Sequence, residues 1–480
     1  MSDSTLKIKA GKGLLWSGIS SGSIQFLNLV FGIFLARLLN ASDYGMVGML
    51  TIFSLIAGSL QDSGFSLALI NKPNVTKKDY NAVFWFSSLM GIALYLSLFF
   101  SSPLLARFFH TPELKSLARY AFLGTLFSSF GIVPAARLSR NLKFRERAVS
   151  SITALLISGI TGVVLAYKGF SYWGIATQTN LYTLIVSALN WWFLRWRPTL
   201  SFDFSPIRNF FGFSSKMLLT SIFTHINNNL FSVILGRFYN RTAVGNYNQA
   251  NKWNTMCDSL IYTTINSVSQ PVLAQVADDR KRQARIFRKI LRITAFLSFP
   301  TMFGLSLVAP ELITIAITEK WTESAALLRL LAIGGAFLPI SLLYSNLLVS
   351  NGKSDIYMWN TMALGVLQVG TMLLLFPYGI RTMIYVYMGL NTAWVFVWHY
   401  FVHKQIGLSL LNALKDVVPY GVVSAGVMVA CHFLTAPISN LYIRFGCKVA
   451  LAVLLYIAAM RLSGSKTYAD CRNFLLRRKI

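Results

Sequence analysis

The chain is built from long apolar segments, each about as long as a helix that crosses a lipid bilayer. Such a helix needs roughly 20 mainly apolar residues, and fourteen segments of this kind follow one another with short connections. They are residues 14–36, 46–70, 82–102, 116–136, 149–167, 171–194, 214–236, 246–271, 293–316, 325–349, 356–376, 380–402, 417–436 and 441–461. Backbone polar groups inside a bilayer must be satisfied within their own segment, which favours helices. The sequence therefore predicts an all-α integral membrane protein with about 14 transmembrane helices.

Composition agrees with a membrane protein and argues against a nucleic-acid partner. Of the 480 residues, 55% are hydrophobic and 12% are charged, whereas soluble domains carry about 25% charged residues. The formal net charge is +28, but the basic residues lie in short clusters along the whole chain. Such clusters are typical of the loops that set membrane topology. We therefore expect membrane lipids, and no nucleic acid, around this protein.

The basic residues also predict which side each loop faces. Of the 44 lysines and arginines, 31 fall on the two termini and on alternate loops, with the largest clusters at 137–148 and 278–292. Loops rich in lysine and arginine stay in the cytoplasm. An even number of spans places both termini on one side. Both termini are therefore predicted to be cytoplasmic.

An internal repeat relates the first half of the chain to the second. The segment ARLLNASDYG (36–45) aligns without gaps with GRFYNRTAVG (236–245). The identical pairs are Arg37 with Arg237, Asn40 with Asn240, and Gly45 with Gly245. Each segment ends an apolar span, and six spans follow from each start, so the repeats share one orientation. This predicts two lobes related by a pseudo-two-fold axis along the membrane normal, as in two-lobed transporters.

The predicted division has three parts. Residues 1–197 form an N-lobe of helices one to six, and residues 198–405 form a C-lobe of helices seven to twelve. Residues 406–480 add helices thirteen and fourteen and a basic cytoplasmic tail.

Polar residues recur at helical spacing on three of the predicted spans. On the eighth span they are Asn248, Asn251, Thr255, Asp258, Tyr262, Asn266 and Ser269. The seventh span has Ser214, Ser221, His225, Asn228 and Ser232, and the first has Ser17, Ser21, Gln25, Asn28 and Gly32. Small and amide residues can bond neighbouring membrane helices together. Alternatively, the three stripes line a water-filled cavity between the lobes, where ionisable residues are tolerated.

The candidate cavity is mainly basic, which predicts an anionic and hydroxyl-rich ligand. Arginine binds phosphate in a bidentate manner, and amides exchange hydrogen bonds with sugar hydroxyls. We predict a pyrophosphate and glycan site formed by Arg37, Arg237, Lys252, Asn28, His225, Asn228 and Asn251. Two alternatives remain at this point: the arginines only anchor helix ends, and Lys252 extends to the interface.

Two acids inside the first eight spans are candidates for ion coupling. Asp62 and Asp258 could each carry or gate a coupling cation, and Asp62 could instead be a salt-bridge partner. The sequence contains no GxSxG, P-loop or HExxH pattern, and its four cysteines and five histidines show no metal-ligand spacing. Such patterns accompany common catalytic and metal sites. We therefore predict no enzymatic activity, no metal and no cofactor beyond coupling to H⁺ or Na⁺.

Several segments resemble, in order and spacing, one branch of a transporter superfamily. They are FLARLLNASDYG, QDSGFSLALI, VFWFSSLMG, PAARLSRNLKFRERA, LGRFYNRTAVGNYNQANKW, SQPVLAQVADDR, EKWTESAALLRLLAIGGAF and NGKSD. These are similar to the polysaccharide transport branch of the multidrug/oligosaccharidyl-lipid/polysaccharide (MOP) superfamily. The two halves differ at Asp43, whose counterpart is Ala243.

The resemblance implies a bacterial inner-membrane flippase. It would move undecaprenyl-pyrophosphate-linked oligosaccharide to the periplasmic leaflet for O-antigen lipopolysaccharide, capsule or exopolysaccharide assembly. It also implies a V of two six-helix lobes like that of multidrug (MATE) transporters, alternating access, a proton or sodium gradient and a monomeric state. Polysaccharide polymerase and export machinery would be its neighbours.

Three rival functions remain open from the sequence. A drug/cation antiporter of the same superfamily typically has twelve helices and an acid in the first or seventh helix, and this chain has no such acid. A peptidoglycan-precursor flippase would share the pyrophosphate ligand. A membrane glycosyltransferase, polymerase or ligase should show a long outer loop or catalytic acids.

Overall fold

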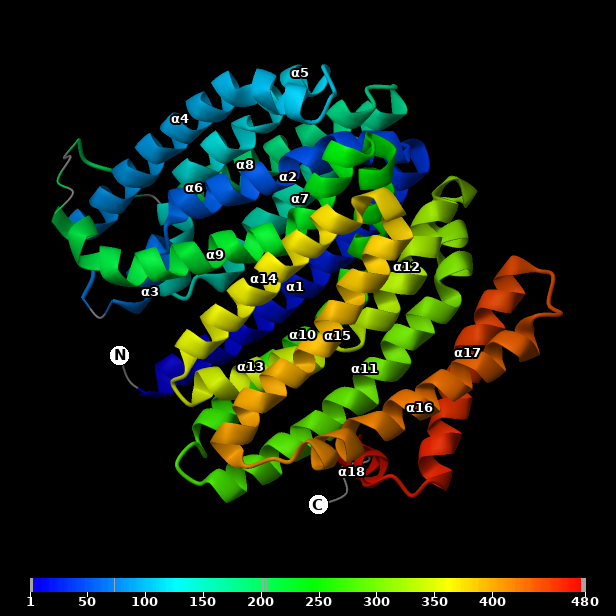
Figure 1. The fold of residues 1–480 in the computed structure, drawn as a ribbon. Coiled ribbons are helices and arrows are strands. Elements are labelled where there is room, and N and C mark those ends of the chain that lie inside the picture. Colours follow the sequence, from blue (N-terminus) through cyan, green and yellow to red (C-terminus); the bar gives the residue numbers. More distant parts are fainter. Residues whose placement is uncertain (1–2, 73, 195, 201–202, 204, 476–480) are drawn as a thin grey trace. The chain divides into compact units, whose positions relative to one another are not determined.

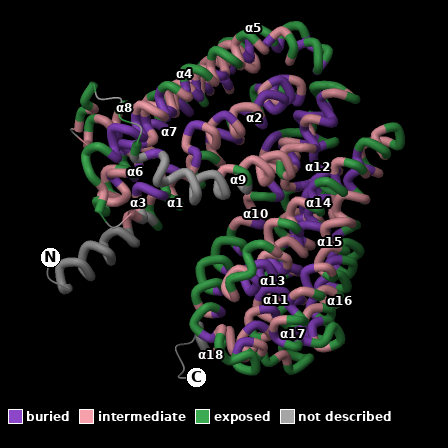
Figure 2. The backbone as a smooth tube through the Cα atoms, turned by 60° about the vertical axis from the view of Figure 1, so that its left-hand side comes forward, coloured by how far each residue is buried: buried purple, intermediate pink, exposed green. Residues whose placement is uncertain are grey.

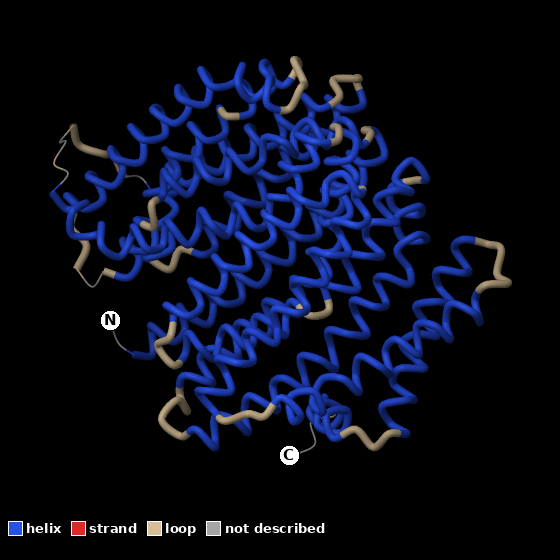
Figure 3. The backbone as a smooth tube through the Cα atoms, in the orientation of Figure 1, coloured by secondary structure: helices blue, strands red, loops and turns tan. Residues whose placement is uncertain are grey.

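The structure is a computed structural model that describes all residues except 1–2, 73, 195, 201–202, 204 and 476–480. The described residues form helices joined by turns and loops, with no strand among them (Figure 3). The chain divides into two compact units, Met1–Gly245 and Asn246–Ile480. The predicted all-α membrane fold is confirmed, while the three-part division at 197/198 and 405/406 stays a prediction.

The first unit contains nine helices and the first turn of a tenth within its described residues (Figure 1). They are α1 (Asp3–Leu38), α2 (Ala41–Asp62), α3 (Phe65–Asn71), α4 (Lys77–Phe108), α5 (Leu114–Ala121), α6 (Leu123–Arg140), α7 (Phe144–Tyr167), α8 (Tyr172–Leu194), α9 (Ser205–Phe238) and the start of α10 (Arg241–Ala274). α7 packs against α1 and α8, and α8 packs against α6. One apolar cluster joins α3, α4 and α6, and Trp191 and Trp196 pack against it.

The second unit begins inside α10 and continues to the C-terminal tail. Its further elements are α11 (Arg280–Ile317), η1 (Glu319–Trp321), α12 (Thr322–Gly335), α13 (Leu338–Ser350), α14 (Ser354–Leu375), η2 (Phe376–Tyr378), α15 (Ile380–Ile406), α16 (Leu410–Thr435), α17 (Leu441–Leu462) and α18 (Lys466–Leu475). The long α11 packs against α12, α16 and α17. α16 and α17 form a hairpin that packs on α11. At one end of this hairpin, Arg288 of α11 donates two hydrogen bonds to the carboxylate of Asp416 on α16, at 2.5 and 3.1 Å.

Each predicted span coincides with one helix or with two consecutive helices. Within the described residues, ten stretches are long and apolar enough to cross a membrane by length and composition. The predicted spans outside this set lie on α8, α9, α10 and α15. Two of these four helices carry predicted polar stripes, which lower their mean hydropathy. The total of fourteen spans therefore stays a prediction.

Large apolar side chains remain exposed on the surfaces of the helices, as expected where lipid is the solvent. Exposed residues follow α16 and α17 (Figure 2), including Val422 at 65% exposure and Leu454 at 64%. Lipid tails are as apolar as leucine, so membrane helices associate through close packing and polar contacts instead. The contacts that hold α16 and α17 in place are accordingly partly ionic.

The predicted span 46–70 is broken between α2 and α3. Ser63 and Gly64 adopt left-handed backbone conformations, with φ values of 44° and 74°. The side-chain carboxylate of Asp62 accepts a hydrogen bond from the backbone N–H of Ser66 at 3.0 Å. Such a bond satisfies an otherwise unpaired donor at a helix start. Asp62, the last residue of α2, therefore has a structural contact with the first turn of α3.

Candidate functional site

The two repeat segments begin their second helices in the same way. The side-chain oxygen of Asn40 accepts a hydrogen bond from the N–H of Asp43 at 3.0 Å. Two hundred residues later, the side-chain oxygen of Asn240 accepts one from the N–H of Ala243 at 2.9 Å. Asparagine is among the preferred N-cap residues of helices. The Asn40–Asn240 identity therefore has a physical cause, since each starts a helix.

The two glycines of the repeat mark a close, reciprocal crossing of α2 with the start of α10. A Cβ atom at Gly45 would lie 1.7 Å from the carbonyl oxygen of Arg241, and one at Gly245 would lie 1.7 Å from that of Ala41. Positions 41 and 241 are themselves equivalent in the repeat. Only glycine allows two backbones to approach so closely. Such a reciprocal contact is what a local two-fold axis between these two helix starts would produce. The predicted pseudo-two-fold relation between whole lobes stays a prediction.

The difference between the halves at Asp43 also has a structural reason. One carboxylate oxygen of Asp43 accepts a hydrogen bond from the N–H of Asn40 at 3.1 Å, which completes a capping box. The other accepts from the hydroxyl of Ser171, just before α8. Asp43 is 8% exposed. Its carboxylate thus joins α2 to the start of α8, a connection that the methyl group of Ala243 cannot make because it has no hydrogen-bond acceptor.

The two repeat arginines lie at the last turns of α1 and α9. Arg37 is exposed, and Arg237 is half-buried. Nη1 of Arg237 donates a hydrogen bond to the carbonyl of Phe108 at 2.8 Å and contacts a ring nitrogen of His110. The guanidinium carbon also lies 5.2 Å from the centre of the Phe108 ring. These contacts fit the anchoring alternative for Arg237, because they satisfy the C-terminal end of α4.

The predicted glycan-facing residues of the first unit are accessible. Asn28 of α1 and Asn228 of α9 are exposed, and His225 is half-buried. The backbone carbonyl of His225 accepts a hydrogen bond from the side chain of Asn229 at 3.0 Å. Asn28 and Asn228 are therefore not enclosed within the first unit, and a ligand at its surface can contact them.

The polar stripe of α10 divides into two parts with different environments. Near its C-terminal end, Asn266 and Ser269 both bond the side-chain amide of Asn346 on α13, at 3.1 and 2.8 Å. That part joins helices together, as the packing interpretation predicts. Further toward the start of α10, Asn251 and Lys252 are half-buried.

Asp258, in the middle of α10, is a buried carboxylate. It is 9% exposed, and its Oδ1 has no hydrogen-bond partner among the described residues. A buried ionised carboxylate without a partner is strongly disfavoured. Ion coupling at Asp258 or at Asp62 stays a prediction.

The predicted site residues fall in both units. Five of them, Asn28, Arg37, His225, Asn228 and Arg237, belong to the first unit, and Asn251 and Lys252 belong to the second. Their assembly into one cavity stays a prediction. Across the described residues, no three histidine, cysteine, aspartate or glutamate side chains come together as a metal site would require.

The predicted site does not include a buried ion pair in the second unit. Nζ of Lys448 on α17 lies 2.7 Å from Oε1 of Glu311 on α11, and both side chains are nearly inaccessible. The signal in the sequence is an acid and a base, each inside an apolar span where an isolated charge is costly. Their separation along the chain hides the pairing.

Comparison with solved structures defines the fold. The lipid II flippase MurJ in an inward-closed conformation gives a TM-score of 0.77 at 17% identity, covering 97% of this chain and 100% of that chain. An inward-facing multidrug resistance MATE family transporter of the MOP superfamily gives a TM-score of 0.64 at 19% identity, covering 80% and 94%. The protein therefore shares the fold of these two membrane transporters.

The sequence relatives are proteins of polysaccharide biosynthesis. The succinoglycan biosynthesis transport protein ExoT of Rhizobium meliloti is 24% identical, covering 94% of this chain and 90% of ExoT. The teichuronic acid biosynthesis protein TuaB of Bacillus subtilis is 25% identical, with 83% and 81% covered. The lipopolysaccharide biosynthesis protein WzxC of Escherichia coli is 25% identical, with 73% and 72% covered.

Residues 34–326 match the family described as "Polysaccharide biosynthesis protein". The chain belongs to this family. The predicted resemblance to polysaccharide flippases is confirmed, and the protein is a membrane transporter of polysaccharide biosynthesis.

Proposed function

We propose that this protein moves a lipid-linked oligosaccharide across the bacterial inner membrane. The substrate is an undecaprenyl-pyrophosphate-linked repeat unit, which passes from the cytoplasmic to the periplasmic leaflet during assembly of a surface polysaccharide. The two lobes alternate between inward-open and outward-open states. Both termini are cytoplasmic, the protein acts as a monomer, and polymerase and export machinery receive its product.

One observation carries this proposal. A polysaccharide-biosynthesis family match over 34–326 coincides with a lipid-flippase fold that covers 97% of the chain. A multidrug transporter fold covers a smaller share, 80% of the chain. The family match supports a glycan as part of the substrate, and the likeness to a lipid flippase supports a lipid as the other part.

Depletion of the protein in its own host tests the proposal. Lipid-linked repeat units should then accumulate with their glycans on the cytoplasmic side, and surface polysaccharide should disappear while glycan synthesis continues. Restoring the wild-type chain should reverse both effects. Loss of the lipid-linked repeat units themselves would instead indicate a role in synthesis and would contradict the proposal.

The basic residues are proposed to bind one part of the ligand, and the amide residues and His225 are proposed to bind the other. Arg37, Arg237 and Lys252 hold the pyrophosphate, while Asn28, His225, Asn228 and Asn251 line the glycan path. Exposure of Asn28 and Asn228 supports this arrangement, and the contacts of Arg237 with Phe108 oppose it for that residue. A charge-assisted contact to phosphate contributes about 1.5–3 kcal/mol. Arg37→Ala should therefore weaken substrate binding by roughly one to two decades.

Lysine substitutions separate binding from anchoring. Arg37→Lys should not restore turnover fully, because the bidentate geometry is lost. If the arginine only anchors a helix end, the lysine variant should transport at the wild-type rate per folded molecule. Transport per folded molecule is therefore the quantity to measure.

Coupling to an ion gradient is proposed to depend on Asp258. Its burial without a hydrogen-bond partner for Oδ1 supports the proposal. Asp258→Asn should abolish gradient-driven accumulation while leaving downhill exchange. Asp62→Asn is the matched control, because the amide oxygen can still accept the hydrogen bond from the N–H of Ser66. Unchanged gradient dependence in Asp258→Asn would exclude this role.

A further inference from the structure

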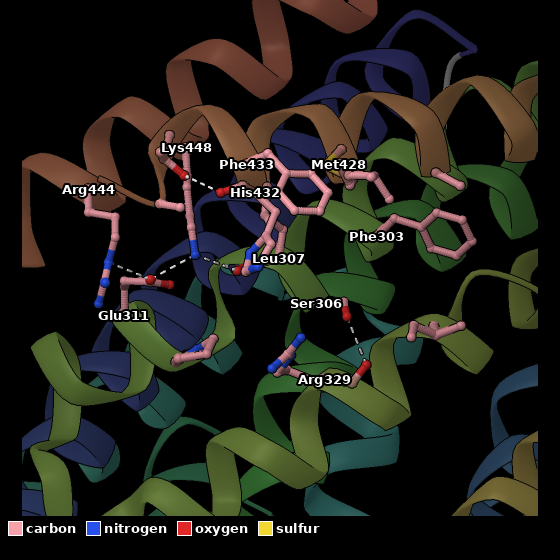
Figure 4. Close-up of a pocket in the computed structure, with 16 residues that line it drawn as sticks. Phe303, Ser306, Leu307, Glu311, Arg329, Met428, His432, Phe433, Arg444 and Lys448 are labelled. Carbon is pink, nitrogen blue, oxygen red and sulfur yellow. Dashed lines mark hydrogen bonds and ion pairs between the residues drawn. The ribbon is translucent and has the colours of Figure 1, made fainter. Parts of the chain in front are cut away.

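A cavity of about 740 Å³ lies within the second unit, between α11, α12, α16 and α17 (Figure 4). Its walls are largely apolar and include Phe303, Ile333, Met428, Val429 and Phe433. Val429 is 56% exposed and Phe433 is 71% exposed, so one wall continues onto the outer surface of the helices. The volume lies in the range of small-molecule binding pockets. An apolar chain could extend from this cavity along α16.

The charges that line the cavity are unbalanced. Three basic side chains, Arg329, Arg444 and Lys448, line the cavity together with one acid, Glu311, so basic residues outnumber acidic ones by two. Nζ of Lys448 and Nε of Arg444 lie 2.7 and 3.0 Å from the same oxygen, Oε1 of Glu311 (Figure 4). Lys448 also donates a hydrogen bond to the carbonyl of Leu307 at 3.3 Å. One carboxylate therefore serves two cations and cannot neutralise the third.

Arg329, an exposed residue of α12 that lines the cavity, is that third basic side chain. Among the described residues, its guanidinium has no hydrogen bond or ion pair, although its backbone carbonyl accepts one from the hydroxyl of Ser306 at 2.9 Å. The other oxygen of Glu311, Oε2, is buried and has no partner within the same part of the chain. The cavity thus lacks an anion for Arg329 and a hydrogen-bond donor for Glu311. A phosphate headgroup that also carries hydroxyl groups provides both.

The cavity lies toward one end of each of its four helices. α11 ends at Ile317 and α12 begins at Thr322, while α16 ends at Thr435 and α17 begins at Leu441. Arg329 is seven residues into α12, which corresponds to about 10 Å along the helix axis. A long arginine side chain can lie along apolar surface with its charged end directed toward the end of the helix. This end is opposite the basic loop 278–292, so the predicted topology places it on the outer side.

We propose that this cavity binds an anionic glycerophospholipid with a hydroxylated headgroup, of the phosphatidylglycerol type. Arg329 and Arg444 contact the phosphate, Glu311 accepts a hydrogen bond from a headgroup hydroxyl, and one acyl chain packs against Met428, Val429 and Phe433. The bound lipid joins α12 to the α16–α17 hairpin. This site is separate from the proposed glycan path and does not depend on that assignment.

Native mass spectrometry of the purified full-length protein tests the site. The protein is exchanged into detergent and titrated with phosphatidylglycerol, phosphatidylcholine, undecaprenyl phosphate or inorganic phosphate. We expect retention of one phosphatidylglycerol with preference over phosphatidylcholine. Arg329→Gln should weaken that retention by about tenfold, since one charge-assisted contact is lost. The matched control is Arg381→Gln, an exposed arginine whose nearest acid is Glu323 at 3.5 Å and which does not line the cavity.

Each other outcome bears directly on the proposal. Equal retention of phosphatidylcholine, or equal binding by wild type and Arg329→Gln, would overturn it. Binding of inorganic phosphate without lipid would reduce the cavity to a small-anion site, and a preference for undecaprenyl phosphate would assign it to the carrier lipid. Arg329→Lys is the second variant, and it should retain more phosphatidylglycerol than Arg329→Gln, because the charge is kept.

Discussion

The reciprocal glycine crossing gives the sharpest prediction about the fold. In Gly45→Ala, the new methyl group would lie 1.7 Å from the carbonyl oxygen of Arg241 and 2.6 Å from its carbonyl carbon. Contacts of a real Cβ are essentially never shorter than 3.0 Å, so α2 and the start of α10 must separate by about 1.3 Å. The obstacle is backbone, which cannot rotate aside as a flexible side chain would. The whole crossing has to shift.

The magnitude follows from two opposing effects. Overpacking costs about 1–3 kcal/mol, and the backbone obstacle places this substitution near the upper end. Alanine is favoured over glycine in a helix by about 1 kcal/mol. We therefore expect Gly45→Ala to lower the free energy of unfolding by about 2 kcal/mol. Gly58→Ala is the control in the same helix, because nothing lies within 4 Å of its Cβ position, and it should be neutral or stabilising.

Thermal unfolding of the detergent-purified variants measures the difference. Gly45→Ala should unfold several degrees below Gly58→Ala, and Gly245→Ala should match Gly45→Ala. The double variant should cost less than the sum of the two, because one separation relieves both clashes and contacting sites are not additive. Equal melting temperatures for Gly45→Ala and Gly58→Ala would refute the crossing.

Two further predictions concern stability and topology. Asp43→Ala removes the hydrogen bonds to Ser171 and to the N–H of Asn40, so it should lower the free energy of unfolding by about 1–2 kcal/mol. An unchanged unfolding temperature would show that the α2–α8 connection does not stabilise the fold. In a variant without its native cysteines, Lys168→Cys should react with a membrane-impermeant maleimide added outside intact cells. Asn141→Cys should react only after the cells are permeabilised. The opposite labelling pattern would reverse the predicted orientation.

Hydropathy predicts where helices lie because the bilayer allows few alternatives. A span of about 20 apolar residues must be helical, and each predicted span does fall on a helix or on two consecutive helices. The sequence also indicates the helix starts at Ala41 and Arg241, since asparagine, present at positions 40 and 240, is a preferred N-cap residue. The break at Ser63–Gly64 was less visible, because apolar sequence continues after it.

Partners across the fold could not be read from the sequence. The stripe on α10 predicts a polar face, but not that Ser269 bonds Asn346 on α13. Glu311 and Lys448 are separated by 137 positions, and only the packing of α17 on α11 brings them together. Helical periodicity locates a polar face; which helix or ligand meets that face depends on tertiary packing.

Leaflet-specific accessibility of the glycan in proteoliposomes tests the central claim most directly. Purified protein is reconstituted in vesicles that carry a lipid-linked oligosaccharide extracted from its host, labelled on the glycan, and the fraction exposed to an external quencher is followed over time. The account predicts that the protected fraction becomes accessible only in vesicles containing the protein, and that labelled phosphatidylcholine in the same vesicles stays protected. A protected fraction that never changes, or equal exposure of phosphatidylcholine, would contradict a specific glycolipid flippase.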